Sequence, residues 1–429
     1  MTGRKTIIFL ALCLFCFAVR LPAGEPPPAP AEATKPLLER DTITDNWFGL
    51  GRGLEADGIA VGLTLTQIYQ VNVRGGTATG RHAGRYTGSW DLQLEADPAR
   101  LLRLPALAGG TLLLVAEGSW SNGIDDSSIG SLFGANDDAG GNRSIDLTEL
   151  WYEHELLDGK VRVRAGKIDL TGGFQCCGCA ASFDGNAFAN DETTQFLNGA
   201  LVNNPTIPFP DNGLGAMLYV EPIEGFYLSV GAADANADAR ETGFNTVFTG
   251  EDRFLSIYEV GITPLLESPR GPLQGACRIG FWLDSGPVER INQDGAERDN
   301  MGLYLSLDQM FWKENADADD AQGLGAFFRY GMGDSDTNEI KAFYSAGVQY
   351  QGLLSGRDED VLAAGFATGT LSAQAGHSAD TETVIETYYS IQITPWLTLA
   401  PSLQVIFNPG GTDDVHDAVV LGFRLQMSF

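Results

Sequence analysis

Charged side chains recur at alternate positions of several segments that are otherwise apolar. A guanidinium group donates hydrogen bonds in a planar fork and a carboxylate accepts them, so opposed Arg and Asp or Glu side chains suit a neutral, hydroxyl-rich ligand. Tyr and Trp on the same faces could offer flat rings along which a cyclic ligand slides. The candidate lining residues are Arg162, Arg164, Arg278, Arg329, Arg424, Asp91, Glu95, Glu259, Asp308, Glu386, Tyr304 and Trp396.

A purely structural role requires the same residue types. An ion pair in a protein wall that only neutralises buried charge also combines Arg with Asp or Glu. A Tyr or Trp near the end of a strand is typical of a membrane-interface anchor. Both interpretations of the candidate residues stay open at this point.

Strands must position these residues. In the C-terminal stretch VVLGFRLQMSF, apolar Leu421, Phe423 and Leu425 alternate with small or polar residues. Successive side chains of a strand point to opposite faces, so this stretch has one apolar and one polar face. Similar alternation predicts about sixteen strands, although the register is ambiguous in 110–122 and 144–156. The predicted strands span 60–73, 87–97, 110–122, 144–156, 160–170, 212–221, 225–235, 253–264, 274–284, 301–311, 320–332, 341–352, 361–372, 382–394, 396–406 and 417–429.

The connections between the predicted strands alternate in length. The even-numbered connections are often tight, such as the one around Asp158, whereas the odd-numbered ones tend to be longer and rich in Gly, Asn and Asp. Short turns on one side and long loops on the other are typical of an outer-membrane barrel with both termini in the periplasm. We therefore predict an all-β fold, a transmembrane antiparallel β-barrel in which the terminal Phe429 lies in the interfacial girdle.

The N-terminus has the layout of an export signal. Arg4 and Lys5 precede a short apolar run and a small-residue stretch that ends near Ala23, which predicts a signal peptide over 1–23. A Pro/Ala-rich periplasmic tether over 24–40, a short N-terminal periplasmic helical segment over 41–58 and the outer-membrane barrel over 59–429 are predicted to follow. No later segment has the roughly 20 continuous apolar residues of a membrane helix, so any crossing must use strands.

Composition excludes several classes of partner and reaction. The chain has 56 acidic and 27 basic residues and a formal net charge of -29, which argues against nucleic acid as a partner because phosphates bind basic surfaces. The chain has 4 His residues and no Ser in a nucleophile-elbow context, so no enzyme is predicted. No cofactor or metal site is predicted either. The acidic stretch GDSDTNEI matches a calcium-binding loop poorly, with weak divalent binding as the lesser alternative.

Three stretches resemble the carbohydrate-selective porins of the OprB type. They are DTITDNWFGLGRGLEADGIAVGLTLTQIYQVNV, ETTQFLNGALVNNPTIPFPDNGLGA and the closing ETYYSIQITPWLTLAPSLQVIFNPGGTDDVHDAVVLGFRLQMSF. The resemblance implies a sixteen-stranded barrel in the cell outer membrane. It also implies that mono- and oligosaccharides diffuse through it into the periplasm without energy coupling. Its expected partners are carbohydrate solutes and outer-membrane lipid.

Other functions remain as alternatives. A general or non-sugar diffusion porin would share the barrel, and a secreted carbohydrate-binding or carbohydrate-hydrolysing β protein could use paired carboxylates. The secreted protein would leave the alternation of loop lengths and the closing strand unexplained. The sequence does not identify the sugar, and it leaves the oligomeric state open, with a monomer among the options.

The longest connection, 171–211, is predicted to fold partly into the mouth of the barrel. It contains FQCCGCAASF, which departs from the family pattern. A local disulfide among Cys176, Cys177 and Cys179 is the first interpretation, because exported proteins meet oxidising conditions. Cys277 is predicted to be unpaired and lipid-facing.

Overall fold

The computed structural model describes residues 35–80, 83–174, 183–190, 195–238, 243–250, 252–317 and 320–429. The predicted signal peptide and Cys176, Cys177 and Cys179 lie outside the described residues. Within these ranges, no helix is long and apolar enough to cross a membrane.

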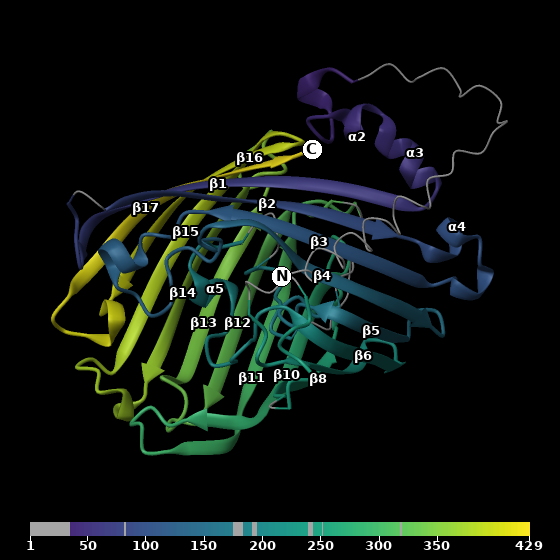
Figure 1. Cartoon of the computed structure of the whole chain (residues 1–429). Coiled ribbons are helices and arrows are strands. Elements are labelled where there is room, and N and C mark those ends of the chain that lie inside the picture. Colours follow the sequence, from purple (N-terminus) through teal and green to yellow (C-terminus); the bar gives the residue numbers. More distant parts are fainter. Residues whose placement is uncertain are drawn as a thin grey trace.

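Sixteen long antiparallel strands close into one barrel (Figure 1). Each long strand pairs with its neighbours in chain order, and β17 returns to pair with β1, from Thr64 opposite Ser428 to Gly76 opposite His416. A further strand, β9 (Leu265–Leu266), has two residues and pairs with β10. The long strands are β1 (Ile59–Gly76), β2 (Gly84–Ala96), β3 (Gly110–Trp120), β4 (Arg143–Leu156), β5 (Val161–Ile168), β6 (Gly213–Ile223), β7 (Phe226–Asp234), β8 (Phe254–Ile262), β10 (Leu273–Glu289), β11 (Ala296–Lys313), β12 (Gly323–Gly333), β13 (Ile340–Gln351), β14 (Val361–Leu371), β15 (Thr381–Thr394), β16 (Leu397–Phe407) and β17 (His416–Ser428).

The predicted strands and the predicted barrel are confirmed. Each of the sixteen predicted spans overlaps one long strand, because the two-residue alternation fixes both the strand and its faces. The ambiguity in 144–156 has a local cause. The β3–β4 register shifts so that Val115 pairs with Glu149 and Ala116 with Leu147, which leaves Thr148 as an extra, bulged residue. A bulge breaks the alternation that sequence analysis follows.

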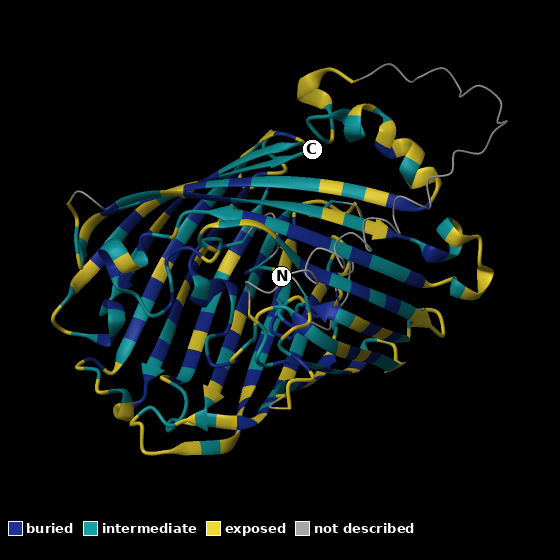
Figure 2. Ribbon diagram, in the orientation of Figure 1, coloured by how far each residue is buried: buried dark blue, intermediate teal, exposed yellow. Residues whose placement is uncertain are grey.

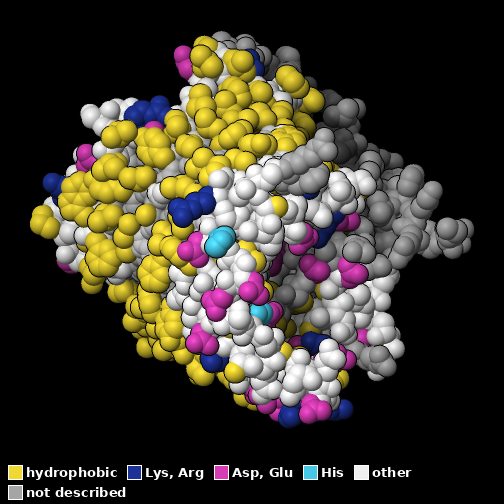
Figure 3. All heavy atoms as spheres, turned by 90° about the vertical axis from the view of Figure 1, so that its left-hand side faces the viewer, with side chains coloured by type: hydrophobic (Ala, Val, Ile, Leu, Met, Phe, Trp, Pro, Cys, Tyr) yellow, Lys and Arg dark blue, Asp and Glu magenta, His cyan; other side chains and the backbone are white. Residues whose placement is uncertain are grey.

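The outer face of the barrel is apolar. Buried and exposed residues alternate along the strands (Figure 2), and a continuous hydrophobic surface covers the side of the barrel (Figure 3). This is the surface that lipid covers, because a membrane-crossing strand points alternate side chains into hydrocarbon. Its exposed members include Tyr69, Val163, Leu228, Tyr258, Val260, Ile279, Leu303, Val348, Phe366, Ile385, Leu421 and Phe423.

Short helices lie in the connections and before the first strand. The α-helices are α2 (Asp45–Phe48), α3 (Leu50–Ala56), α4 (Pro98–Leu102) and α5 (Gly199–Val202). The 3-10 and π-helical turns are η1 (Leu37–Glu39), η2 (Pro105–Leu107), η3 (Asp125–Ile129), η4 (Ala373–Ala375) and η5 (Pro409–Gly411). In the space that the strands enclose, the two longest connections, 121–142 and 169–212, pack against the wall (Figure 1).

Apolar residues of these two connections form the core together with inward-facing wall residues. One cluster joins Ile129 and Phe133 of the first connection and Phe196 of the second to wall residues of β12 to β17. The other joins Phe174 and Phe183 of the second connection to residues of β3 to β11. The inner wall is therefore more apolar than the sequence analysis assumed, because it must pack against the inserted chain.

Leu303→Arg is expected to destabilise the folded barrel in phospholipid vesicles by about 2–4 kcal/mol. Leu303 faces outward opposite Phe281, which in turn lies opposite Tyr258 at the centre of β8, so the new charge would meet hydrocarbon. Val73→Arg is the matched control, because Val73 also faces outward but lies close to the end of β1 and should cost only about 0–1 kcal/mol. Urea titration gives the free energy of unfolding, and equal losses at the two positions would contradict the lipid assignment.

Candidate functional site

Nine of the twelve candidate lining residues are buried and therefore point into the barrel. The barrel wall is a single sheet whose outer face is exposed. A buried side chain on one of its strands therefore points to the inside of the barrel. The nine are Arg162, Arg164, Arg278, Arg329, Arg424, Glu259, Asp308, Glu386 and Tyr304. Asp91 is half-buried and Glu95 is exposed. Both share a face of β2 with Thr87, which is buried and accepts a hydrogen bond from Asn136 at 3.0 Å, so they face the more open part of the interior.

Trp396 has a different position. It lies in the turn between β15 and β16, and its indole N–H donates a hydrogen bond of 2.8 Å to the carbonyl of Leu37, before the first strand. The alternation placed Trp396 on the inward face, but β16 begins one residue later, at Leu397. We therefore leave Trp396 out of the proposed lining and assign it to the barrel rim.

Two arginines on β5 share one carboxylate on β4. Arg162 Nε and Arg164 Nε lie 2.8 Å from Glu153 Oε1 and Oε2, respectively. The Arg164 guanidinium also stacks 4.0 Å from the centre of the Trp151 ring, lies 5.1 Å from that of Phe174 and donates to the Gly173 carbonyl at 2.7 Å. Glu153 pairs with Arg164 across the strands, so the sheet register itself builds this cluster. The result is a rigid, partly neutralised basic patch beside the inserted connection.

A second network lies on β7 to β11. Glu259 accepts hydrogen bonds from the hydroxyls of Tyr227 at 2.6 Å and Tyr304 at 2.7 Å, and Arg278 forms an ion pair with Asp308 at 2.5 Å. All five side chains are buried. The hydroxyl of Tyr304 is engaged and its ring belongs to the core cluster, so this network fits the structural interpretation raised from the sequence.

Wall residues of β12, β15 and β17 hold the 169–212 connection. Arg329 donates to the carbonyls of Leu201 at 2.7 Å and Asp184 at 2.9 Å, and Arg424 donates to the carbonyl of Gln195 at 2.7 Å. The two carboxylate oxygens of Glu386 accept from the backbone N–H groups of Leu197 and Asn198, both at 2.9 Å. The expected insertion is therefore observed for the described residues of this connection, and three candidate lining residues serve as its anchors.

The 121–142 connection is also inserted, which the sequence analysis missed. Glu382, four residues before Glu386 on β15, accepts from the backbone N–H groups of Leu132 at 3.0 Å and of Gly410, between β16 and β17, at 2.7 Å. Gln70 and Gln404 both donate to the Ala135 carbonyl, at 2.7 and 2.9 Å. Glu382 shares its face with Glu386, so the alternation could have identified it, but only the tertiary structure shows which amides it binds.

A polar recess lies at the ends of β3 to β6 that carry the long connections. Its volume is about 90 Å³. Charges of both signs meet there, and the Asp146 carboxylate lies 4.0 Å from Arg143 Nε. The lining residues are Glu117, Arg143, Asp146, Leu147, Thr148, Lys167, Asp211 and Asn212. The recess therefore offers donors and acceptors side by side.

Two carboxyl groups on the inserted connections have shifted pKa values. Burial raises the pKa of Asp125 to about 6, although the Ala135 N–H donates to its carboxylate at 2.8 Å. Burial likewise raises the pKa of Asp184 to about 6, although the Arg329 guanidinium lies 3.6 Å away. Removing these groups from water disfavours their charged forms more than the nearby donors favour them. The charge of both inserted connections therefore changes in mildly acidic solution.

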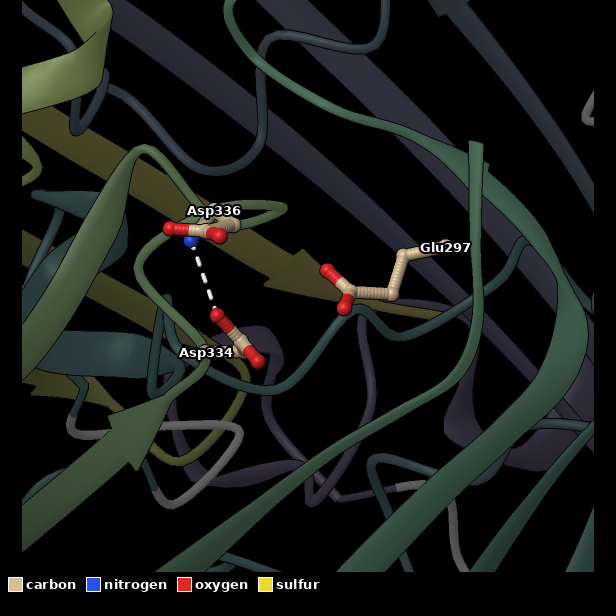
Figure 4. Close-up of side chains that lie close together, drawn as sticks. All are labelled: Glu297, Asp334 and Asp336. Atoms are coloured by element: carbon tan, nitrogen blue, oxygen red, sulfur yellow. Dashed lines mark hydrogen bonds between the residues drawn. The ribbon is translucent and has the colours of Figure 1, made fainter. Parts of the chain in front are cut away.

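Three carboxylates meet at the outer end of the barrel: Glu297 on β11 and Asp334 and Asp336 between β12 and β13 (Figure 4). Their oxygens lie within 4.8 Å of one another, a grouping that hard cations such as Ca²⁺ can bind. Protein donors already engage them. The Asp336 N–H donates to Asp334 at 2.8 Å, Arg290 lies 3.3 Å from Glu297, and Gln374 donates to Asp336 at 2.6 Å. The cluster is thus consistent with a solvated acidic loop.

Cys277 on β10 is a free cysteine in the part of the chain that the structure describes. It is half-buried and shares a face with the exposed Ile279, so it lies on the outer side.

Glu386→Ala is expected to loosen the 169–212 connection, because it leaves two buried backbone N–H groups without acceptors at about 1–3 kcal/mol each. Hydrogen exchange at the amides of Leu197 and Asn198 should accelerate accordingly. Ile385→Ala is the control, since Ile385 is the neighbouring residue and faces outward. Unchanged exchange in the Glu386 variant would show that the carboxylate does not anchor the connection.

The chain is similar to known porins over most of its length. Residues 81–429 match the profile of the carbohydrate-selective porin, OprB family. Porin B of Pseudomonas aeruginosa is 24% identical over 382 residues, which cover 81% of this chain and 82% of that protein. Porin AaxA of Chlamydia muridarum is 26% identical over 285 residues, which cover 66% of this chain and 55% of that protein.

A solved structure has the same fold. The high-pH structure of Pseudomonas putida OprB aligns with a TM-score of 0.80 at 21% identity, covering 93% of this chain and 100% of that chain. The fold and the profile therefore agree. The chain belongs to the OprB family of carbohydrate-selective porins.

Proposed function

We propose that this protein is an outer-membrane channel for passive, selective diffusion of mono- and oligosaccharides into the periplasm. The observation that carries the proposal is the interior: a closed barrel whose space is narrowed by two inserted connections and lined by paired charges of both signs. Family membership supports it. A diffusion pore selects by width and by lining groups while binding weakly enough to release its solute, and this interior fits that requirement.

Paired lining charges favour a neutral, hydroxyl-rich solute over an ion. Arg162, Arg164 and Glu153 are buried and partly neutralise one another, so they reduce the net field of the wall. A sugar hydroxyl can both donate and accept, and it can exchange its water contacts for contacts with this wall. Beside these paired charges an ion meets only a reduced net field, so they attract it less than an isolated charge would. No energy source is needed, because transport follows the concentration gradient.

Five of the candidate residues divide into two proposed roles. Glu386, Arg329 and Arg424 are positioning residues, because their polar groups bind the inserted connections. Asp91 and Glu95, which remain more accessible, are proposed to contact solute. The recess that contains Arg143 and Asp146 is proposed to add further solute contacts at the end of the barrel that carries the long connections. Arg162 and Arg164 border this route.

Further proposals concern partners and reactions. Outer-membrane lipid is the proposed partner of the apolar outer face, and the net charge of -29 disfavours nucleic acid. We propose no catalytic role, in keeping with a family of channels. A single chain encloses its own interior, so a monomer is the proposed minimal working unit.

Purified protein in a planar bilayer is expected to conduct ions steadily, because the interior is polar. Glucose and maltose should reduce the single-channel current in a saturable way, while a non-sugar solute of similar size should not. Current without specific sugar block would indicate a general diffusion porin. Absence of current from folded protein would contradict a channel altogether.

Glu95→Gln is expected to lower the K⁺ to Cl⁻ permeability ratio by up to about 7-fold, because a unit charge about 7 Å from an ion in water contributes about 0.6 kcal/mol, with opposite sign for the two ions. The matched control is Glu224→Gln, the same charge change at an exposed position in the β6–β7 turn. Reversal potentials in a salt gradient give the ratio. Equal effects of the two variants would remove Glu95 from the lining.

A further inference from the structure

The segment before the first strand exposes an unusual amount of apolar surface. Within Leu37–Ala56, which we call the rim segment, the exposed fractions are 48% for Leu37, 68% for Leu38, 82% for Phe48 and 73% for Leu50. Grouped apolar side chains of this size on a short segment mark a contact surface.

Hydrogen bonds fix the rim segment to the periplasmic edge of the barrel. Trp47 donates from its indole N–H to the Val61 carbonyl of β1 at 3.0 Å, and Trp396 donates to the Leu37 carbonyl at 2.8 Å. The Ile43 N–H donates to the carbonyl of Ser428, the last residue of β17, at 2.9 Å. In Figure 1, α2 and α3 lie outside the barrel wall beside β1, at the end where the C-terminus lies. These hydrogen bonds to the strands therefore fix the position of the rim segment along the barrel and the side of the wall on which it lies.

The rim segment is amphipathic. At 3.6 residues per turn, Leu50 and Leu54 lie on one face of α3, and Arg52 and Glu55 lie on the other. Polar contacts gather on the second face, where Asn46 donates to Glu55 at 2.9 Å and Arg52 lies 3.7 Å from Asp45. The face of Leu50 and Leu54 is left without such contacts in the described residues, and Phe48, two residues before α3, is also exposed.

The rim segment also satisfies a backbone carbonyl of β1 that β17 does not reach. The β1–β17 pairing begins at Thr64, so β1 extends past the end of β17. There the Phe429 N–H donates to the Leu63 carbonyl at 2.9 Å and Trp47 satisfies the Val61 carbonyl. An unpaired carbonyl at the edge of the hydrocarbon would be costly, so the rim segment completes the closure of the sheet.

We propose that the rim segment lies in the headgroup region of the periplasmic leaflet and that Phe48 and Leu50 insert among phospholipid acyl chains. The apolar outer face of the barrel, established as the lipid surface, runs along β1 and β17 to this edge, and the indoles of Trp47 and Trp396 bind the segment there. Tryptophan at such an edge is typical of the headgroup level. A short amphipathic segment held at that level buries its apolar face in the interface.

Photo-cross-linking tests the proposal in the full chain. Phe48 is replaced by p-benzoylphenylalanine, and the protein is reconstituted in vesicles of radiolabelled phosphatidylethanolamine and phosphatidylglycerol. The matched control carries the same photoreactive residue in place of Arg52, on the polar face. The positive control for lipid contact carries it in place of Leu303. We expect at least about fivefold more lipid adduct at position 48 than at position 52, because acyl chains reach only the apolar face.

Lipid adduct at position 303 but not at position 48 would overturn the proposal, and so would a protein adduct at position 48 in cells that replaces the lipid adduct.

A second measurement is trypsin cleavage after Arg52 in vesicles. The double variant Phe48→Ser, Leu50→Ser should be cut several-fold faster than the unaltered protein. Leu102→Ser, Leu104→Ser, which removes two exposed leucines elsewhere on the same rim, should leave that rate unchanged. Equal cleavage in all three proteins would also overturn the proposal.

Discussion

A sheet that crosses a bilayer must leave no backbone N–H or C=O group facing hydrocarbon unpaired, and only closure of the sheet on itself meets that requirement. In this protein the β1–β17 pairing provides closure, and the remaining strands follow in chain order between these two. The outward apolar residues, the inward polar residues and the position of the C-terminus follow from it. Trp47 and the Phe429 N–H also donate hydrogen bonds to carbonyls of β1. These bonds pair backbone groups of β1 that lie beyond the last paired residue of β17.

Closure also creates an enclosed space, and the chain fills much of it with its own connections. Inserted irregular chain carries N–H groups that need acceptors and carbonyls that need donors, and the wall supplies buried carboxylates for the first and Gln side-chain amides for the second. Glu386 and Glu382 each bind two or more backbone N–H groups, and Gln70 and Gln404 meet at one carbonyl of the other connection. Anionic acceptors suit this task because charge-assisted hydrogen bonds are stronger than neutral ones. The width of the remaining route thus depends on polar anchoring as much as on strand number.

The same residue types serve three purposes in the interior. Glu259, Tyr227 and Tyr304 form a closed network within the wall, Arg329 and Arg424 hold inserted chain, and Asp91 and Glu95 stay more accessible. Burial separates these groups, since a fully buried charge must have partners and cannot readily exchange them for a passing solute. A lining residue of a diffusion pore must do the opposite, because it exchanges water for solute and back again.

The sequence by itself determined the strands and most of their faces, because a period of two residues is a local property that each segment carries independently. It also identified Arg162, Arg278 and Glu386 as inward-facing, since one face of each strand is apolar. The tertiary structure alone decided that Glu386 binds the amides of Leu197 and Asn198 and that the 121–142 connection enters the barrel, because these contacts join residues far apart in the chain. Trp396 shows the same limit. Alternation assigned it to the inward face. Its hydrogen-bond partner, the carbonyl of Leu37, comes from the opposite end of the chain, and no periodic pattern encodes such a contact.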